Sequence, residues 1–200
     1  MRVWLVFILS IGLASPIHAE TYSFPEYGFE MTCADSWEQI SLVTSEDFDT
    51  IDTGNSDTNE LIRSRPLHGL LRLWNPGEPT GGPPEILVNL RPMIKGSAYE
   101  NLKKGRQNLL ERLEVLSIRG PGRTRIGEFE GAVLDASVTL YLDGEPLVAR
   151  VLQYRAKLGS NELAVIVSHA PDIDPRVLPE IDACVQSLRR IGQPSTEKGK

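Results

Sequence analysis

The chain has 200 residues, with 21 Lys and Arg against 27 Asp and Glu, so its formal net charge is -6. A length of this size favours a single domain. The acidic balance argues against nucleic acid or an anionic membrane surface as the main partner, because both carry negative charge themselves.

Residues 1–19 have the three regions of a secretory signal peptide. Arg2 supplies the basic start, residues 3–13 are apolar, and the small residue Ala19 precedes the expected cleavage site. The apolar run is shorter than the roughly 20 residues that a helix needs to cross a bilayer, which favours a cleaved signal over a membrane anchor. The sequence therefore predicts an exported protein, periplasmic or secreted, with no membrane span after cleavage.

The mature part contains two cysteines, Cys33 and Cys184. An even pair of cysteines in an exported protein predicts one disulfide, because that compartment is oxidising. The alternative is two unrelated buried thiols, since a free cysteine behaves as a small apolar side chain. We expect the Cys33–Cys184 bridge.

The first half of the mature chain has the patterns of strands and loops. Residues 27–31 are expected to form a strand that pairs with a returning strand over residues 37–43. Residues 44–60 are rich in Asp, Thr, Ser, Gly and Asn and predict an exposed acidic loop. Two further strands are expected at residues 67–74 and 85–92.

The main helix is expected to begin after Ser97, whose hydroxyl can accept a free N–H of the first turn, with Glu100 completing a capping box. Residues 120–122 (Gly-Pro-Gly) are expected to end it, and residues 123–129 to form a short strand. One apolar stripe at spacings of three and four is formed by Ala98, Leu102, Gly105, Leu109, Leu113 and Leu116.

Residues 131–167 predict three consecutive antiparallel strands. Apolar residues alternate with polar ones over residues 132–142, which is the period of a half-buried strand. The dipeptide Asp143-Gly144 favours a tight hairpin turn, and residues 147–158 form the second strand. A second turn at residues 159–161 leads to the apolar strand 163–167.

A final helix is expected to start between Pro175 and Pro179 and to bury one face that includes Cys184. The polar tail, residues 192–200, is expected to be disordered. The predicted fold class is α+β: residues 20–191 form one domain in which an antiparallel sheet is packed with two main helices, an α/β/α-type sandwich.

Several local features resemble the PsbP-like superfamily, which includes DcrB-like exported bacterial proteins. They are Tyr27-Gly28-Phe29 and Trp37 near the start, Gly131-Ala132 and Asp143-Gly144 in the three-strand region, and Ser187-Leu188-Arg189 at the end. The resemblance covers roughly residues 24–191, and Cys33-Ala34 stands where the family usually has a turn proline. It implies a PsbP-like fold and a binding or accessory protein, and it transfers no active site.

The residues themselves predict no catalytic, cofactor or metal site. Asp52-Thr53-Gly54 matches an aspartic-protease tripeptide, but it lies among polar neighbours and needs a second aspartate to share the proton. Residues 49–60 can be aligned with a calcium loop only with Ile51 at a ligand position, so an irregular calcium site in the acidic loop stays open. His68 and His169 have no acidic or cysteine neighbour at ligand spacing.

Arg119, Arg123 and Arg125 form a local basic run. Most such runs are solvated faces, and the functional alternative is a docking patch for an acidic partner. We therefore expect a non-enzymatic accessory or adaptor protein, without a cofactor, that binds another envelope protein. The alternative is a periplasmic carrier of a small ligand, a lipid or calcium.

Overall fold

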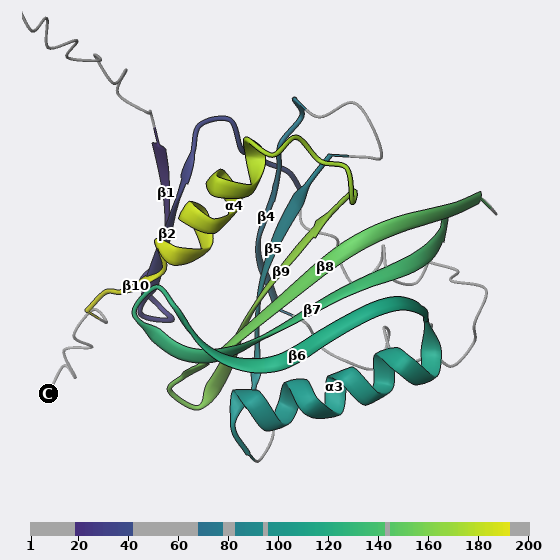
Figure 1. Cartoon of the computed structure of the whole chain (residues 1–200). Coiled ribbons are helices and arrows are strands. Elements are labelled where there is room, and N and C mark those ends of the chain that lie inside the picture. The colour runs from purple at the N-terminus through teal and green to yellow at the C-terminus, as the bar shows by residue number, and fades with distance from the viewer. Residues whose placement is uncertain (1–18, 42–67, 78–82, 94–95, 143–144, 193–200) are drawn as a thin grey trace, which may run out of the picture.

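The computed structural model describes residues 19–41, 68–77, 83–93, 96–142 and 145–192. Within them the chain forms ten strands, β1 to β10, and two helices, α3 and α4 (Figure 1). Ala19 begins β1, whereas the remainder of the predicted signal peptide, the acidic loop and the tail from residue 193 lie outside the described residues. None of the described helices is both long and apolar enough to span a membrane.

Seven antiparallel strands form the main sheet, in the order β3-β4-β5-β9-β8-β7-β6. The predicted run of three consecutive strands is confirmed in its centre, where each of β7, β8 and β9 pairs with the next along the chain. Their bounds are β3 Glu38–Gln39, β4 His68–Trp74, β5 Glu85–Pro92, β6 Glu114–Ile126, β7 Phe129–Leu142, β8 Glu145–Leu158 and β9 Asn161–His169. A smaller sheet joins β1 (Ala19–Phe24), β2 (Phe29–Ala34) and β10 (Arg189–Arg190).

The two helices cover opposite faces of the main sheet, which confirms the predicted α+β class (Figure 1). Helix α3 (Ala98–Arg112) buries Leu102 against Ala132 and Leu134 of β7. Helix α4 (Val177–Gln186) packs with the small sheet over the other face. It begins where the sequence predicts, and Cys184 lies on its buried side.

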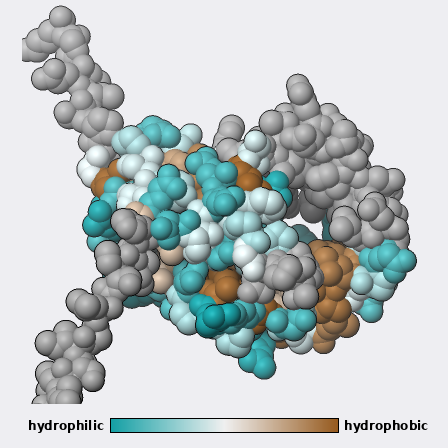
Figure 2. Space-filling view, turned by 90° about the horizontal axis from the view of Figure 1, so that it is seen from above, coloured by the Kyte–Doolittle hydropathy of each residue, from teal (hydrophilic) through white to brown (hydrophobic). Residues whose placement is uncertain are grey.

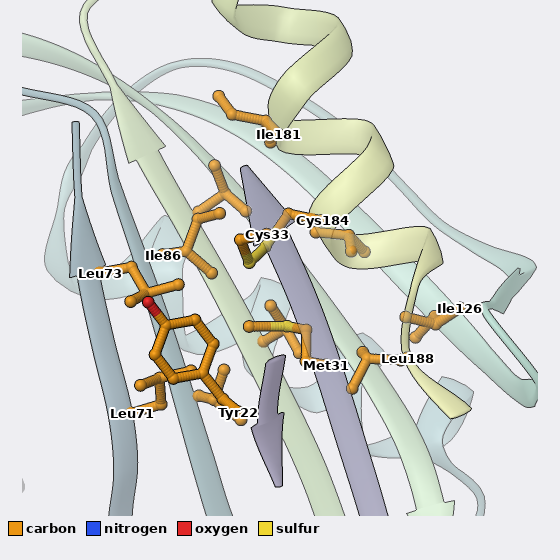
Figure 3. Close-up of a cluster of buried hydrophobic side chains, with 14 of the residues drawn as sticks. Tyr22, Met31, Cys33, Leu71, Leu73, Ile86, Ile126, Ile181, Cys184 and Leu188 are labelled. Atoms are coloured by element: carbon orange, nitrogen blue, oxygen red, sulfur yellow. A yellow bond between two sulfur atoms is a disulfide. The ribbon is translucent and has the colours of Figure 1, made fainter. Parts of the chain in front are cut away.

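The main core lies between α4, the small sheet and the strands β4, β5 and β9 (Figure 3). Tyr22, Leu71 and Ile86 come together there from three different strands. Cys33 of β2 and Cys184 of α4 lie at disulfide-bonding distance, with their Cα atoms 4.5 Å apart. The pair thus links two elements that are 151 residues apart in the sequence.

The opening hairpin differs from the prediction. Strand β2 pairs with β1, which precedes it, and not with residues after Trp37. The short strand β3 that follows Trp37 joins β4 in the main sheet instead. Strand β1, which the sequence pattern did not predict, pairs along the whole of β2, and its alternate residues Tyr22 and Phe24 pack against the core.

The end of the main helix also differs from the prediction. Helix α3 stops at Arg112 and is capped by Leu113, so Leu116 lies in β6 and is 54% exposed rather than part of the buried stripe. The Gly120-Pro121 segment does not end a helix; it lies within β6. Val115 and Ile118 are β-branched and pair with β7, and this pairing outweighs the helical spacing of the leucines.

The β7–β8 hairpin extends beyond its neighbours. Pairing of β8 with β9 begins only at Arg150, and pairing of β7 with β6 ends at Thr139. Leu140 and Tyr141 of β7 and Val148 of β8 therefore have a strand on one side only and are exposed, although the alternation predicts Leu140 to be buried. Figure 2, which looks onto the side away from α3, shows a mainly hydrophilic surface with several separate groups of apolar side chains.

A fully buried carboxylate, Glu162 of β9, holds the N-terminal end of α3 on the sheet. Arg91 of β5 donates to it from Nε at 2.7 Å, and Arg155 of β8 donates from Nη1 at 2.8 Å. Asn101, in the early part of α3, donates from its side-chain amide at 2.6 Å. Two guanidinium groups and an amide therefore replace the water that the carboxylate loses on burial.

The arrangement of the cysteines predicts that the oxidised protein contains no free thiol. We expect no label when the oxidised, unreduced protein is unfolded in guanidinium and alkylated, and two labels when it is first reduced. Unfolding is needed because both side chains are buried. Intact mass spectrometry counts the labels, and two labels without reductant would remove the disulfide.

Changing Glu162→Gln should destabilise the fold by about 3–5 kcal/mol, because it leaves two largely buried guanidinium groups without their counter-charge. Glu85→Gln is the matched control on the same sheet. Its partner Arg72 and Glu85 itself are about a quarter exposed, so the loss there should be roughly 0–1 kcal/mol. Urea unfolding measures both, and equal losses would contradict the role given to Glu162.

Candidate functional site

A groove of about 770 Å³ lies between the N-terminal end of α3 and the C-terminal end of β6. On the helix side it is lined by Ala98 and Tyr99, together with Met93 from the segment that follows β5. On the sheet side it is lined by Arg123 and Arg125 of β6 and by Lys157 of β8, among others. Side chains far apart in the sequence thus meet because α3 lies along this face of the sheet.

The helix wall follows from the start of α3. The Ser97 hydroxyl accepts the Glu100 N–H at 3.2 Å, which confirms the predicted cap and fixes the first turn. Tyr99 in that turn packs on the cluster around Leu102. The guanidinium carbon of Arg123 lies 5.7 Å from the centre of the Tyr99 ring, a cation–π contact that connects the two walls.

The sheet wall depends on an irregularity in β6 between Arg119 and Gly122. Arg119 pairs with Asp135 of β7, whereas Arg123 pairs with Ala132, and residues directly opposite each other share a face of the sheet. Ala132 packs toward α3, and Asp135, three residues further along β7, points to the other face. Arg119 therefore lies on the face away from α3.

Arg125 pairs with Glu130 and lies on the same face as Arg123, because the two arginines are two residues apart on a strand. The structure thus brings together two members of the predicted patch, Arg123 and Arg125, and separates Arg119 from them. The irregular stretch contains Gly120, which has φ 87°. A Cβ at this position would lie 2.9 Å from the Val133 carbonyl oxygen, so the turn of the strand requires glycine.

The groove is positively charged in a chain that is acidic overall. Arg123, Arg125 and Lys157 are exposed, and no carboxylate of the described residues lies within ion-pair distance of any of them. Among the described residues that line the groove, Glu130 is the single carboxylate, so three cations against one anion leave a net charge of +2 there. Such a concentration of charge attracts an anionic partner and speeds its approach.

The positive charge decreases from this groove to the two neighbouring hollows. A neighbouring hollow of about 520 Å³ shares Arg125, Glu130 and Lys157 with it, but adds Glu128 and Arg190, which balance each other. A third hollow, of about 290 Å³, continues from Arg190 towards Tyr27. Counted over the described lining residues, the net charge is thus +2 in the groove between α3 and β6, +1 in the second hollow and 0 in the third.

The opposite face of the sheet holds a second polar cluster. Arg150 donates to both oxygens of Asp135, at 3.0 and 2.9 Å, and these hydrogen bonds lower the pKa of that carboxyl. Burial raises the pKa of the Tyr154 hydroxyl nearby. A carboxylate held ionised by a guanidinium is a poor general base, because its affinity for a proton has been reduced.

His169, at the end of β9, belongs to the same region and is buried. Its Nδ1 lies 2.6 Å from the Ala170 carbonyl oxygen, an interaction that orients the ring. In the part of the chain that the structure describes, no three His, Cys, Asp or Glu side chains come together in a way that could hold a metal ion. Residues 44–60, with the calcium and protease alternatives, lie outside that part, as does the His68 side chain.

The sequence did not identify the helix side of the groove or Lys157. Tyr99 is not one of the residues of the apolar stripe of α3. An aromatic residue outside that stripe, in the first turn of the helix, is the feature of the sequence that could have indicated this wall of the groove. Lys157 of β8 lies opposite Glu162 of β9. The alternation of residues does not show which residues face each other until the register of the two strands is known. Glu162 carries no signal, because a charged residue at the start of a strand is normally exposed.

Comparisons with known proteins show which known fold the chain shares. No protein-family model matches the chain, and a search of curated proteins found no match. Among solved structures, LpqN of Mycobacterium tuberculosis, described as involved in cell envelope biogenesis, superposes with a TM-score of 0.52 at 12% identity, over 86% of this chain and 90% of LpqN. The cyanobacterial PsbP protein of Synechocystis, CyanoP, gives a TM-score of 0.51 at 12% identity, over 92% of this chain and 98% of CyanoP.

Identities this low establish the shared architecture and not the activity. Both superpositions extend over nearly the whole of each chain, so the likeness concerns the complete domain and not one supersecondary motif. The resemblance noted in the sequence is thereby confirmed at the level of structure: the chain has a PsbP-like fold.

Proposed function

We propose that this chain is a non-catalytic accessory protein of the cell envelope that binds another envelope protein in the groove between α3 and β6. The observation that carries the proposal is the net charge of +2 from cations that have no ion-pair partner among the described residues. Three cations around a hollow with one carboxylate give it a positive potential, and complementary potentials favour the approach and binding of an anionic partner.

The proposed location rests on three observations. The sequence has the pattern of a signal peptide cleaved after Ala19. Cys33 and Cys184 lie at disulfide-bonding distance, and disulfides persist in oxidising compartments. A structural relative, LpqN, is described as involved in cell envelope biogenesis. Together they support a periplasmic or secreted protein.

A carrier of a small ligand or lipid is the second candidate, and the volume of the groove favours it. About 770 Å³ lies within the range of small-molecule pockets. Such pockets usually enclose an apolar ligand and contain few charges, whereas one wall of this groove is formed by three cations. That wall is better matched to a charged protein surface, so the adaptor is the preferred function.

The proposal predicts which charges matter. Replacing both Arg123 and Arg125 by Glu should abolish capture of the partner when the tagged protein is crosslinked in intact envelopes and its complexes are identified by mass spectrometry. The reversal changes the groove from a net +2 to a net -2, so an anionic surface is repelled.

Arg119→Glu is the matched control. It reverses a single charge on the same strand but on the opposite face of the sheet, and it should leave capture unchanged, whereas Arg123→Glu alone, the equivalent single reversal in the groove, should weaken capture. Circular dichroism must show that all variants are folded. A partner that is lost equally with Arg119→Glu, or retained by the double variant, would refute docking in the groove, and an empty capture from folded, abundant protein would favour the carrier.

A further inference from the structure

The two walls of the groove differ in chemistry. The helix wall offers apolar surface from Met93, Ala98 and the ring of Tyr99, whereas the wall formed by β6 and β8 offers the three cations. A partner that fills the groove must therefore present acidic side chains to one wall and apolar side chains to the other. A surface that is only acidic would leave the helix wall unmatched, and one that is only apolar would bury charges without partners.

The cations on β6 also have a defined spacing. Arg123 and Arg125 are two residues apart on one strand and point to the same side, so their Cα atoms are roughly 7 Å apart. Side chains two residues apart on an extended partner chain have the same repeat. Carboxylates at alternate positions of an extended segment can therefore face both arginines at once, whereas on a helix the side chains at i and i+2 do not share a face.

An extended chain presents its intervening side chains to the opposite side. When the acidic side chains face β6, the residues between them face the helix wall with Ala98 and Tyr99. We propose that the partner's docking element is an extended segment in which acidic and apolar residues alternate. This inference rests on the proposed function, because it specifies what the groove recognises.

The experiment compares two labelled eight-residue peptides of the same composition. One alternates Glu and Val, and the other has four Glu followed by four Val. Fluorescence anisotropy with the full mature protein should show the alternating peptide binding at least tenfold more tightly than the block peptide. Binding should weaken as salt is raised, because the charges are exposed.

The variants used to test docking also test this inference. Replacing Arg123 and Arg125 by Glu should weaken the alternating peptide tenfold or more, and Arg119→Glu should change it less than twofold. Equal affinity for the two peptides would overturn the proposed alternation. Vesicles containing anionic phosphatidylglycerol form a third arm: if they bind with the same dependence on the two arginines and the peptides do not, the groove recognises a lipid surface instead.

The failure of this inference is distinguishable from the failure of the proposed function. If an envelope protein is captured through Arg123 and Arg125 while the two peptides bind alike, the docking site stands and the partner contributes a folded acidic surface. If no partner is captured and neither peptide binds, both proposals are wrong.

Discussion

The structure around the groove depends on the buried Glu162 and the three groups that donate to it. A carboxylate without water is tolerated only when its lone pairs are occupied, and Arg91, Arg155 and Asn101 occupy them from two neighbouring strands and from α3. Because Asn101 lies in the early part of the helix, this network fixes the end of α3 that forms the wall of the groove. The other residues that α3 buries, Ala98 and Leu102, lie close to Asn101, so the anchored end of the helix is also the end that lines the groove.

The second determinant is the irregularity in β6. In a regular strand Arg119, Arg123 and Arg125 would all point to one face, since they are separated by even numbers of residues. The break near Gly120 reverses this relation, and Arg119 then lies with Asp135 while the other two face α3. The three arginines are thus divided: Arg123 and Arg125 belong to the wall of the groove, and Arg119 lies beside Asp135 on the opposite face.

Much of the fold follows from alternation and turn residues. The pattern through residues 131–167 predicts β7, β8 and β9, and the cap at Ser97 predicts the start of α3. The predictions that were wrong depended on competition between elements. Residues 114–118 lie in β6 and not in the helix because they pair with β7, and β2 pairs with β1, a strand that the sequence pattern did not predict. Only part of the candidate site, the groove between α3 and β6, could be predicted from the sequence. Arg123 and Arg125 were identified from their charge, but Tyr99, Lys157 and Glu162 acquire their roles only from contacts across strands, which local sequence does not encode.

The central claim is that the groove between α3 and β6 is the surface that meets the partner. The most direct test is to place a photo-crosslinking phenylalanine analogue at Tyr99, inside the groove, and at Ser117, which is exposed and pairs with Ser137 on the opposite face. Irradiation of intact envelopes should then join one protein to the chain from position 99 and none from position 117. Equal crosslinking from both positions, or crosslinking from position 117 alone, would contradict the account.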